Sequence, residues 1–234
     1  MANSRACALS ALVFVLGLGG GARADGEEPR DCAHEVASRV QASYEGVRDL
    51  EARFTQKSRS VAFAGAGQEM HARGVALFAK PGRMRWTYEE PEPSLVVSDG
   101  QTLWIYDPVA KEAQEFSVGE GFLSGTAVQF LLGEGRILEA FDVAAEGCGA
   151  GAVRLFLRPR AEATYESLEL LVAPESGDVR ATAVVDLFGN RTDVVFESMR
   201  SNLQIDPSKF RFEAGPGVRV LRAGPPAGGG SDSQ

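Results

Sequence analysis

Histidine and cysteine, the usual residues of nucleophilic catalysis and zinc binding, are few in this 234-residue sequence. There are two histidines, His34 and His71, and three cysteines, Cys7, Cys32 and Cys148. Nucleophilic catalysis needs a base, usually histidine, within hydrogen-bonding reach of the nucleophile. Neither histidine accompanies a Gly-x-Ser-x-Gly elbow or a reactive-cysteine motif. The sequence also has no Cys-x-x-Cys or His-x-x-x-His spacing, so we expect no zinc site.

Two other patterns resemble functional motifs but lack the neighbours those motifs require. Gly147, Gly149 and Gly151 resemble a glycine loop, yet no Gly-Lys-Ser/Thr follows and no strand–helix–strand unit surrounds them. The acidic pair Glu89-Glu90 lies in a predicted turn, which is typical of solvated charge. We therefore expect no catalytic residues, no metal and no cofactor, and the protein is not expected to be an enzyme.

Composition narrows the class of protein further. Hydrophobic residues make up 44% and charged residues 24% of the chain, as in ordinary globular proteins. The 24 basic and 32 acidic side chains give a net charge of −8. This acidity argues against nucleic-acid binding, which requires a basic surface that displaces phosphate counterions.

The N-terminus has the pattern of a secretory signal peptide. Arg5 precedes an apolar run at residues 6–18, and Ala22-Arg23-Ala24 forms a small-residue cleavage site. The alternative is a membrane anchor, but a spanning helix needs about 20 apolar residues. Removing residues 1–24 takes away two basic and no acidic side chains, so the net charge would fall from −8 to −10. We expect a domain at residues 25–222 and a disordered Gly- and Ser-rich tail at residues 223–234.

Export also changes the expectation for the cysteines. Cleavage leaves Cys32 and Cys148, and an even pair in an exported protein favours a disulfide over two free thiols. Closing so long a loop is worth about 4–5 kcal/mol in the chain-entropy treatment. Neither cysteine follows a small-residue lipobox, so a lipid anchor is not expected.

The first element of the predicted domain is an amphipathic helix. Apolar residues recur every fourth position at Cys32, Val36, Val40 and Tyr44. Asp31 is suited to the N-cap and Gly46 to the stop.

The rest of the chain alternates with a period of two, which indicates half-buried strands. Strands are predicted at residues 50–57, 71–80, 83–88, 95–98, 102–106, 113–118, 152–157, 167–172, 179–186, 192–199 and 210–213. Asp99-Gly100 and Gly189-Asn190 are hairpin turns. Residues 126–132 form a second helical patch, which Ile137, Leu138 and Phe141 extend. About eleven antiparallel strands make the protein mainly β, with a sheet that must curl into a barrel or split into a sandwich.

Aromatic side chains are concentrated in the alternating strands. They are Phe54, Phe78, Trp86, Tyr88, Trp104 and Tyr106. Any one of them is sufficiently explained by an ordinary core. Together they fit a curled sheet whose interior is larger than a few side chains fill, and such barrels often enclose an apolar ligand. A single amphipathic helix can cover the open mouth of the sheet.

Three sequence blocks carry a resemblance to a known family. They are FTQK at residues 54–57, KPGRMRW at residues 80–86 and LVVSDGQTLWIYDP at residues 95–108. With Asp186, Gly189-Asn190 and Phe210, they resemble the periplasmic outer-membrane lipoprotein carrier family, LolA, over about residues 35–221. The resemblance implies a half-open curled antiparallel β-barrel with an amphipathic helical lid. It also implies a monomeric periplasmic carrier that takes triacylated lipoproteins from an inner-membrane ABC transporter to an outer-membrane receptor.

The resemblance further implies roles for individual residues. Those expected to contact acyl chains are Val36, Val40, Phe54, Met84, Trp86, Tyr88, Val97, Phe130 and Leu131. Family members commonly have an arginine before the proline, which latches the lid to helix carbonyls. This chain has Lys80 there, and lysine lacks the planar fork of arginine, so we expect a weaker latch or none. A Cys32–Cys148 bridge would limit the travel of the lid.

Elementary energetics agree with a carrier. Each acyl methylene that is removed from water contributes about 0.8 kcal/mol. Leaving a chain of about a dozen methylenes exposed to water would therefore cost roughly 10 kcal/mol. A lid whose open and closed states differ by a few kcal/mol shields the chain and still releases it. Two alternatives remain: a lipid- or lipoprotein-binding sensor module of the same fold, and a membrane-anchored acceptor, against which the missing lipobox counts.

Overall fold

The structure is a computed structural model that describes residues 29–63, 69–117, 136–149 and 151–222. The predicted signal peptide at residues 1–24, the predicted tail at residues 223–234 and the helical patch at residues 126–132 lie outside these ranges. Within them, one twelve-stranded sheet runs in the order β12-β6-β5-β4-β3-β2-β1-β11-β10-β9-β8-β7.

The elements have the following bounds. The strands are β1 (Asp49–Arg59), β2 (Glu69–Ala79), β3 (Arg83–Glu90), β4 (Ser94–Ser98), β5 (Thr102–Asp107), β6 (Glu112–Ser117), β7 (Phe141–Glu146), β8 (Val153–Pro159), β9 (Tyr165–Val172), β10 (Val179–Asp186), β11 (Arg191–Ser201) and β12 (Arg219–Arg222). The α-helices are α1 (Pro29–Glu45) and the single turn α3 (Ile137–Ala140), and the 3-10 turns are η1 (Val61–Phe63) and η3 (Pro207–Phe210).

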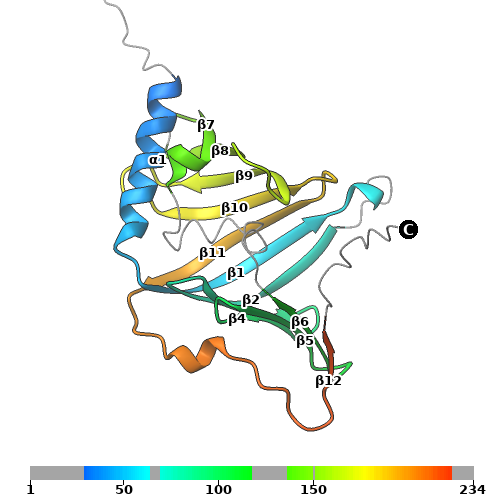
Figure 1. The fold of residues 1–234 in the computed structure, drawn as a ribbon. Coiled ribbons are helices and arrows are strands. Elements are labelled where there is room, and N and C mark those ends of the chain that lie inside the picture. The colour runs from blue at the N-terminus through cyan, green and yellow to red at the C-terminus, as the bar shows by residue number, and fades with distance from the viewer. Residues whose placement is uncertain (1–28, 64–68, 118–135, 150, 223–234) are drawn as a thin grey trace, which may run out of the picture.

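The sheet curls without closing. Its strand pairs are antiparallel except for β12 with β6, which is parallel. The strand order ends at β12 on one side and β7 on the other, and Figure 1 shows the two halves of the sheet folded toward each other beside α1. Strand twist accumulates over twelve strands and bends a large sheet in this way. The predicted mainly-β, half-open curled architecture is confirmed.

The helix forms where the apolar period predicted it, but its start differs. α1 begins at Pro29, so Asp31 lies in the first turn rather than at the N-cap. There its carboxylate faces the positive end of the helix dipole. The helix ends at Glu45, directly before Gly46, as predicted.

Three local predictions were wrong. Glu89 and Glu90 end strand β3 instead of lying in a turn. Phe141 begins strand β7, which pairs with β8, instead of extending a helix. The strand predicted at residues 210–213 is absent: Phe210 ends η3, which Asp206 caps by accepting a 2.9 Å hydrogen bond from the Ser208 backbone N–H. The last described strand is β12, which lies beside β6.

One face of the sheet carries nearly all of its buried apolar side chains. Directly paired residues on neighbouring strands point to the same face. The pairs Phe54–Phe196, Val194–Thr182 and Thr182–Leu170 therefore join β1, β11, β10 and β9 in one continuous surface. We call this the inner face, because α1 packs on it.

Candidate functional site

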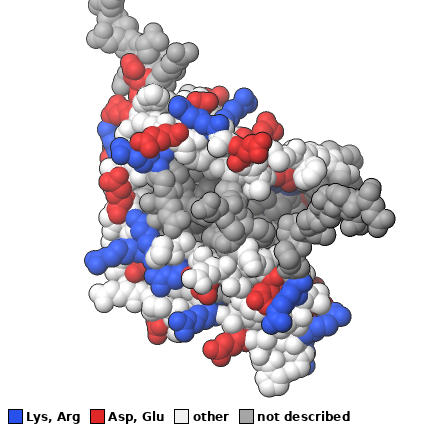
Figure 2. Space-filling view, viewed as in Figure 1, with Lys and Arg blue, Asp and Glu red and all other residues white. Residues whose placement is uncertain are grey.

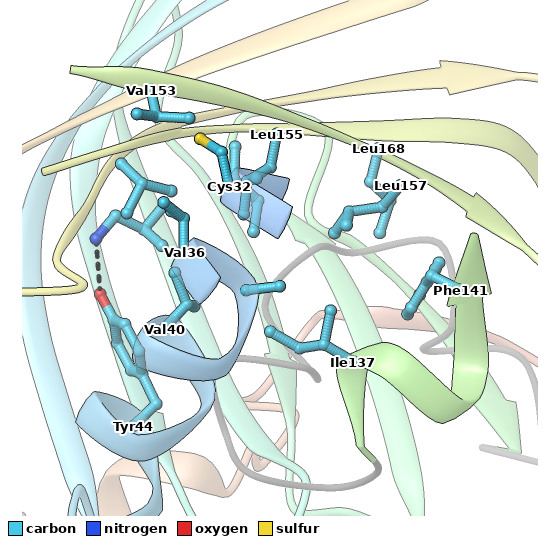
Figure 3. Packing of buried hydrophobic residues seen from close by; sticks show 14 of the residues in the cluster. Cys32, Val36, Val40, Tyr44, Ile137, Phe141, Val153, Leu155, Leu157 and Leu168 are labelled. Atoms are coloured by element: carbon cyan, nitrogen blue, oxygen red, sulfur yellow. Dashed lines mark hydrogen bonds between the residues drawn. The ribbon is translucent and has the colours of Figure 1, made fainter. Parts of the chain in front are cut away.

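The half of the inner face formed by β7 to β10 is covered by α1. Val36 and Val40 of the helix are 4% and 1% exposed and pack against Leu155 and Leu168. Figure 3 shows this packing, which we call the helix cluster. Its buried members are Cys32, Val36, Ala37, Val40, Tyr44, Ile137, Phe141, Val153, Leu155, Leu157, Tyr165, Leu168, Leu170, Val172 and Val179.

The other half of the inner face holds a second cluster, centred on Trp86. The Trp86 ring lies 4.8 Å from that of Phe54, 5.4 Å from that of Phe78 and 6.3 Å from that of Phe196, measured between centroids. We call this the aromatic cluster. Its buried members are Leu50, Ala52, Phe54, Ala76, Phe78, Met84, Trp86, Leu103, Val194 and Phe196, with Tyr88 packed against them. Among the described residues, α1 contributes none of these side chains.

Lys80 joins the end of α1 to the half of the sheet that carries the aromatic cluster. Its Nζ donates hydrogen bonds to the carbonyl oxygens of Tyr44, at 2.9 Å, and Glu45, at 3.1 Å. These carbonyls lie in the last turn of the helix, where no intrahelical donor is left and where a cation is favoured by the dipole. Lysine therefore reaches the helix carbonyls despite lacking the fork of arginine.

Two further contacts hold α1 on the other half of the sheet. A disulfide links Cys32, near the start of the helix, to Cys148 in the β7–β8 turn, with the Cα atoms 6.3 Å apart. At the far end of the helix, the Tyr44 hydroxyl accepts a 3.2 Å hydrogen bond from the Val179 backbone N–H. Burial raises the pKa of Tyr44. The helix is thus attached at both ends.

The structure separates the residues that the sequence grouped as acyl contacts. Phe54, Met84, Trp86 and Tyr88 come together in the aromatic cluster. Val36 and Val40 lie in the helix cluster instead. Phe130 and Leu131 lie outside the described residues.

The prediction that Val97 contacts acyl chains on the inner face is wrong, because Val97 lies on the outer face. It pairs with Arg85 and Trp104, whereas Val96 pairs with Trp86 on the inner face. Val97 is nevertheless 0% exposed, so the apolar pattern of β4 reflects burial on both sides.

The outer face of this half is covered by the segment between β11 and β12, which runs past β2 to β6 in Figure 1. The Phe212 ring lies 5.2 Å from that of Trp104 and 5.0 Å from that of Tyr106, and Arg85 Nη1 donates a 3.0 Å hydrogen bond to the Lys209 carbonyl. Trp104 and Tyr106, expected in the interior, belong to this outer packing.

Other members of the aromatic cluster were not singled out from the sequence. Val194 and Phe196 come from β11, which pairs with β1 although the two strands are far apart in the chain. Their alternation in a predicted strand was the available signal, but alternation does not say which strand lies beside which.

Charged groups lie around the clusters rather than in them. Arg191 donates two hydrogen bonds to Glu169, with Nη2 2.8 Å from Oε2, and this hydrogen bonding lowers the pKa of the Glu169 carboxyl. Figure 2 shows acidic and basic side chains interspersed over one side of the molecule.

In the described ranges, no group of three or more His, Cys, Asp or Glu is placed to hold a metal ion. The described helices include none long and apolar enough to cross a membrane.

The sequence model of the outer membrane lipoprotein carrier protein LolA matches residues 45–213 of this chain, which is well over half of it. The chain belongs to the LolA family. This places it among carrier proteins rather than in an enzyme family.

Individual LolA-family relatives match over most of their length. The outer-membrane lipoprotein carrier protein of Alkalilimnicola ehrlichii is 32% identical over 197 residues, which cover 82% of this chain and 87% of that protein. The protein of the same name from Azotobacter vinelandii is 27% identical over 221 residues, covering 93% and 98%. Among solved structures, an uncharacterized conserved protein from Thermus thermophilus is 15% identical with a TM-score of 0.49, over 82% of this chain and 99% of its own.

Proposed function

We propose that this protein is a periplasmic carrier that binds the acyl chains of lipoproteins released from the inner membrane and delivers them to the outer membrane. Its cargo is a triacylated lipoprotein, which it receives from an inner-membrane ABC transporter and passes to an outer-membrane receptor. Membership of the LolA family and relatives named as outer-membrane lipoprotein carriers support this role.

The observation that carries the proposal is the aromatic cluster itself. Phe54, Trp86 and Tyr88 form edge-to-face contacts on the inner face, and α1 packs on the other half of that face. Aromatic rings and the flexible Met84 side chain give an apolar surface without fixed hydrogen-bonding demands. Such a surface suits acyl chains, which need only to be shielded from water.

The elements around the cluster have separate roles in this proposal. Phe54, Met84, Trp86 and Tyr88 contact the acyl chains, and Val36 and Val40 hold the lid helix on the sheet. Lys80 is the latch between α1 and the sheet, and the Cys32–Cys148 disulfide limits how far the helix moves. Roles for Phe130 and Leu131 remain predictions from the sequence. Binding is non-covalent, so no catalytic residue is required.

Co-purification tests the proposal. We expect the protein isolated from the periplasm to carry triacylated lipoproteins, and Trp86→Asp to lose them. Trp104→Asp is the matched control, because Trp104 lies on the outer face of the same sheet. Circular dichroism of both variants separates loss of binding from loss of fold. A folded wild-type protein that carries no lipoprotein and extracts none from spheroplasts would overturn the proposal.

A further inference from the structure

The inner face changes from apolar to polar along the length of β1. Leu50, Ala52 and Phe54 are at most 5% exposed and belong to the aromatic cluster. The next inward positions on the same strand are Gln56 and Ser58, which are polar and half-buried. Since side chains two positions apart share a face, this is one surface whose chemistry changes with distance from α1.

A groove of about 540 Å³ occupies the polar end of this surface. Its lining mixes the polar side chains of Gln56, Ser58, His71 and Ser94 with the apolar Met70 and Ala72, next to Tyr88, and the β3–β4 connection lies at its edge. Its size falls within the range of small-ligand sites.

Tyr88 makes the groove continuous with the aromatic cluster. Its ring centroid lies 5.2 Å from that of Phe54, and burial raises the pKa of its phenol. Its hydroxyl donates a 3.2 Å hydrogen bond to Gln56 Oε1 in the groove wall. Gln56 Nε2 in turn donates to Ser58 Oγ at 3.1 Å, and Ser58 Oγ lies 3.3 Å from Thr192 Oγ1. A chain of amide and hydroxyl groups therefore begins where the aromatic surface ends.

We propose that this groove binds the polar end of the cargo, namely the ester and amide groups of the acylated cysteine and the first peptide residues after it. The acyl chains then run from the groove over the aromatic cluster toward α1. This inference rests on the proposed function and adds an orientation and a polar subsite to it. A lipoprotein N-terminus has the same sequence of chemistry as the surface: hydrocarbon first, then ester and amide groups, then peptide.

The charge at the edge of the groove indicates which peptides fit best. Glu92 is exposed and has no ion pair within the described residues. Asp107, also in the lining, accepts hydrogen bonds from the backbone N–H groups of Val109 and Ala110 at 2.8 and 2.9 Å, which hold its side chain in place. We expect peptide segments with basic residues after the acylated cysteine to bind more tightly than acidic ones.

Photo-crosslinking tests the orientation. Two synthetic triacylated lipopeptides would carry a diazirine, one at the end of an acyl chain and one on the residue after the cysteine. We expect the peptide probe to label residues 56–58, 70–72 or 88–94, and the acyl probe to label residues 50–54 or 76–86. Exchanged labelling, or a peptide probe that labels only residues outside the groove, would overturn the inference.

A charge exchange tests the specificity. Two lipopeptides with identical acyl chains would carry four lysines or four glutamates after Cys-Ser. Wild type should bind the basic peptide about two- to fivefold more tightly at low salt, the range for exposed ion pairs. Glu92→Lys should abolish or reverse this preference, and Glu175→Lys, an exposed carboxylate in the β9–β10 turn, should leave it unchanged. An unchanged preference in Glu92→Lys, or equal effects of both variants, would contradict the groove assignment.

Failure of the groove and failure of the carrier role give different results. If neither lipopeptide binds, or if a folded Trp86→Asp variant binds both as well as wild type does, the carrier proposal fails. The present inference alone fails if wild type binds both lipopeptides and the Trp86→Asp variant binds neither, while the charge exchange and the crosslinking both give no sign of the groove.

Discussion

The Nζ atom of Lys80 lies 2.9 Å from the carbonyl oxygen of Tyr44 and so connects the β2–β3 turn to the last turn of α1. The opposite end of the helix is attached covalently through Cys32 and Cys148. Because a hydrogen bond breaks far more readily than a disulfide, movement of the helix relative to the aromatic cluster should begin at the Lys80 end.

Replacing Lys80 by alanine should therefore change cargo exchange more than folding. Hydrogen bonds from a charged donor contribute about 1.5–3 kcal/mol, and less where solvent reaches them. We expect Lys80→Ala to speed release of a bound lipopeptide by about three- to tenfold, with Lys80→Arg close to wild type. Stopped-flow release measured beside urea unfolding checks this. If Lys80→Ala lowered the free energy of unfolding by as much as it changed the free-energy barrier to release, the role of Lys80 would be merely structural.

Removing the disulfide should act on stability and spare the acyl-binding surface. Neither cysteine belongs to the aromatic cluster, and the bridge closes a loop with a sequence separation of 116. We expect Cys32→Ser combined with Cys148→Ser to lower the free energy of unfolding by about 2–5 kcal/mol. Urea titration measures this, and thiol titration of the denatured wild type should find no free Cys32 or Cys148. Two free thiols per mature chain would rule the bridge out.

Gly177 in the β9–β10 turn lets that turn approach the middle of α1. Its φ is +78°, and a Cβ atom placed there would lie 2.6 Å from the Arg39 carbonyl oxygen. We expect Gly177→Ala to lower the free energy of unfolding by about 2 kcal/mol or more, because the positive φ alone costs alanine about 1–2 kcal/mol. Gly215→Ala is the control, since nothing lies within 4 Å of its Cβ position. Similar melting temperatures for the two variants would contradict this close packing.

Because of Glu169, the free energy of unfolding should change with pH in the acidic range. Its pKa is lowered in the folded protein by the hydrogen bond from Arg191, so its stabilisation is present above the unfolded pKa near 4.5 and is lost as pH falls through the folded value. Glu169→Gln should thus be less stable than wild type at pH 7, by an amount that shrinks toward pH 3. Urea unfolding across that range, with Glu175→Gln as control, measures it. A difference that does not change with pH would argue against the ion pair.

Alternation of side chains was sufficient to predict most strands, because each has one buried face. Residues 179–186 match β10 at both ends, and Asp99-Gly100 turns the chain between β4 and β5 as predicted. The apolar run in β4 was ambiguous, since Val96 faces inward and Val97 outward under packing from the distant C-terminal segment. Phe141 was misassigned because its spacing from Ile137 also fits a helix.

The same alternation of side chains predicted some members of the aromatic cluster but not others. Trp86 and Phe54 each stand between an arginine and a threonine, so the local alternation already indicated that both side chains point to the buried face. Phe196 required knowledge that β11 lies beside β1, which no local pattern contains. The stripe of Val36 and Val40 showed that the helix is amphipathic without showing which half of the sheet it covers.

Fluorescence quenching by acyl chains that carry bromine would test the location of the lipid most directly. The chain has two tryptophans, so Trp104→Phe leaves only Trp86 on the inner face and Trp86→Phe leaves only Trp104 on the outer face. Titrating each variant with a brominated triacylated lipopeptide should strongly quench Trp86 emission and leave Trp104 emission nearly unchanged. Equal quenching of the two, or quenching of Trp104 alone, would contradict binding of acyl chains against the aromatic cluster.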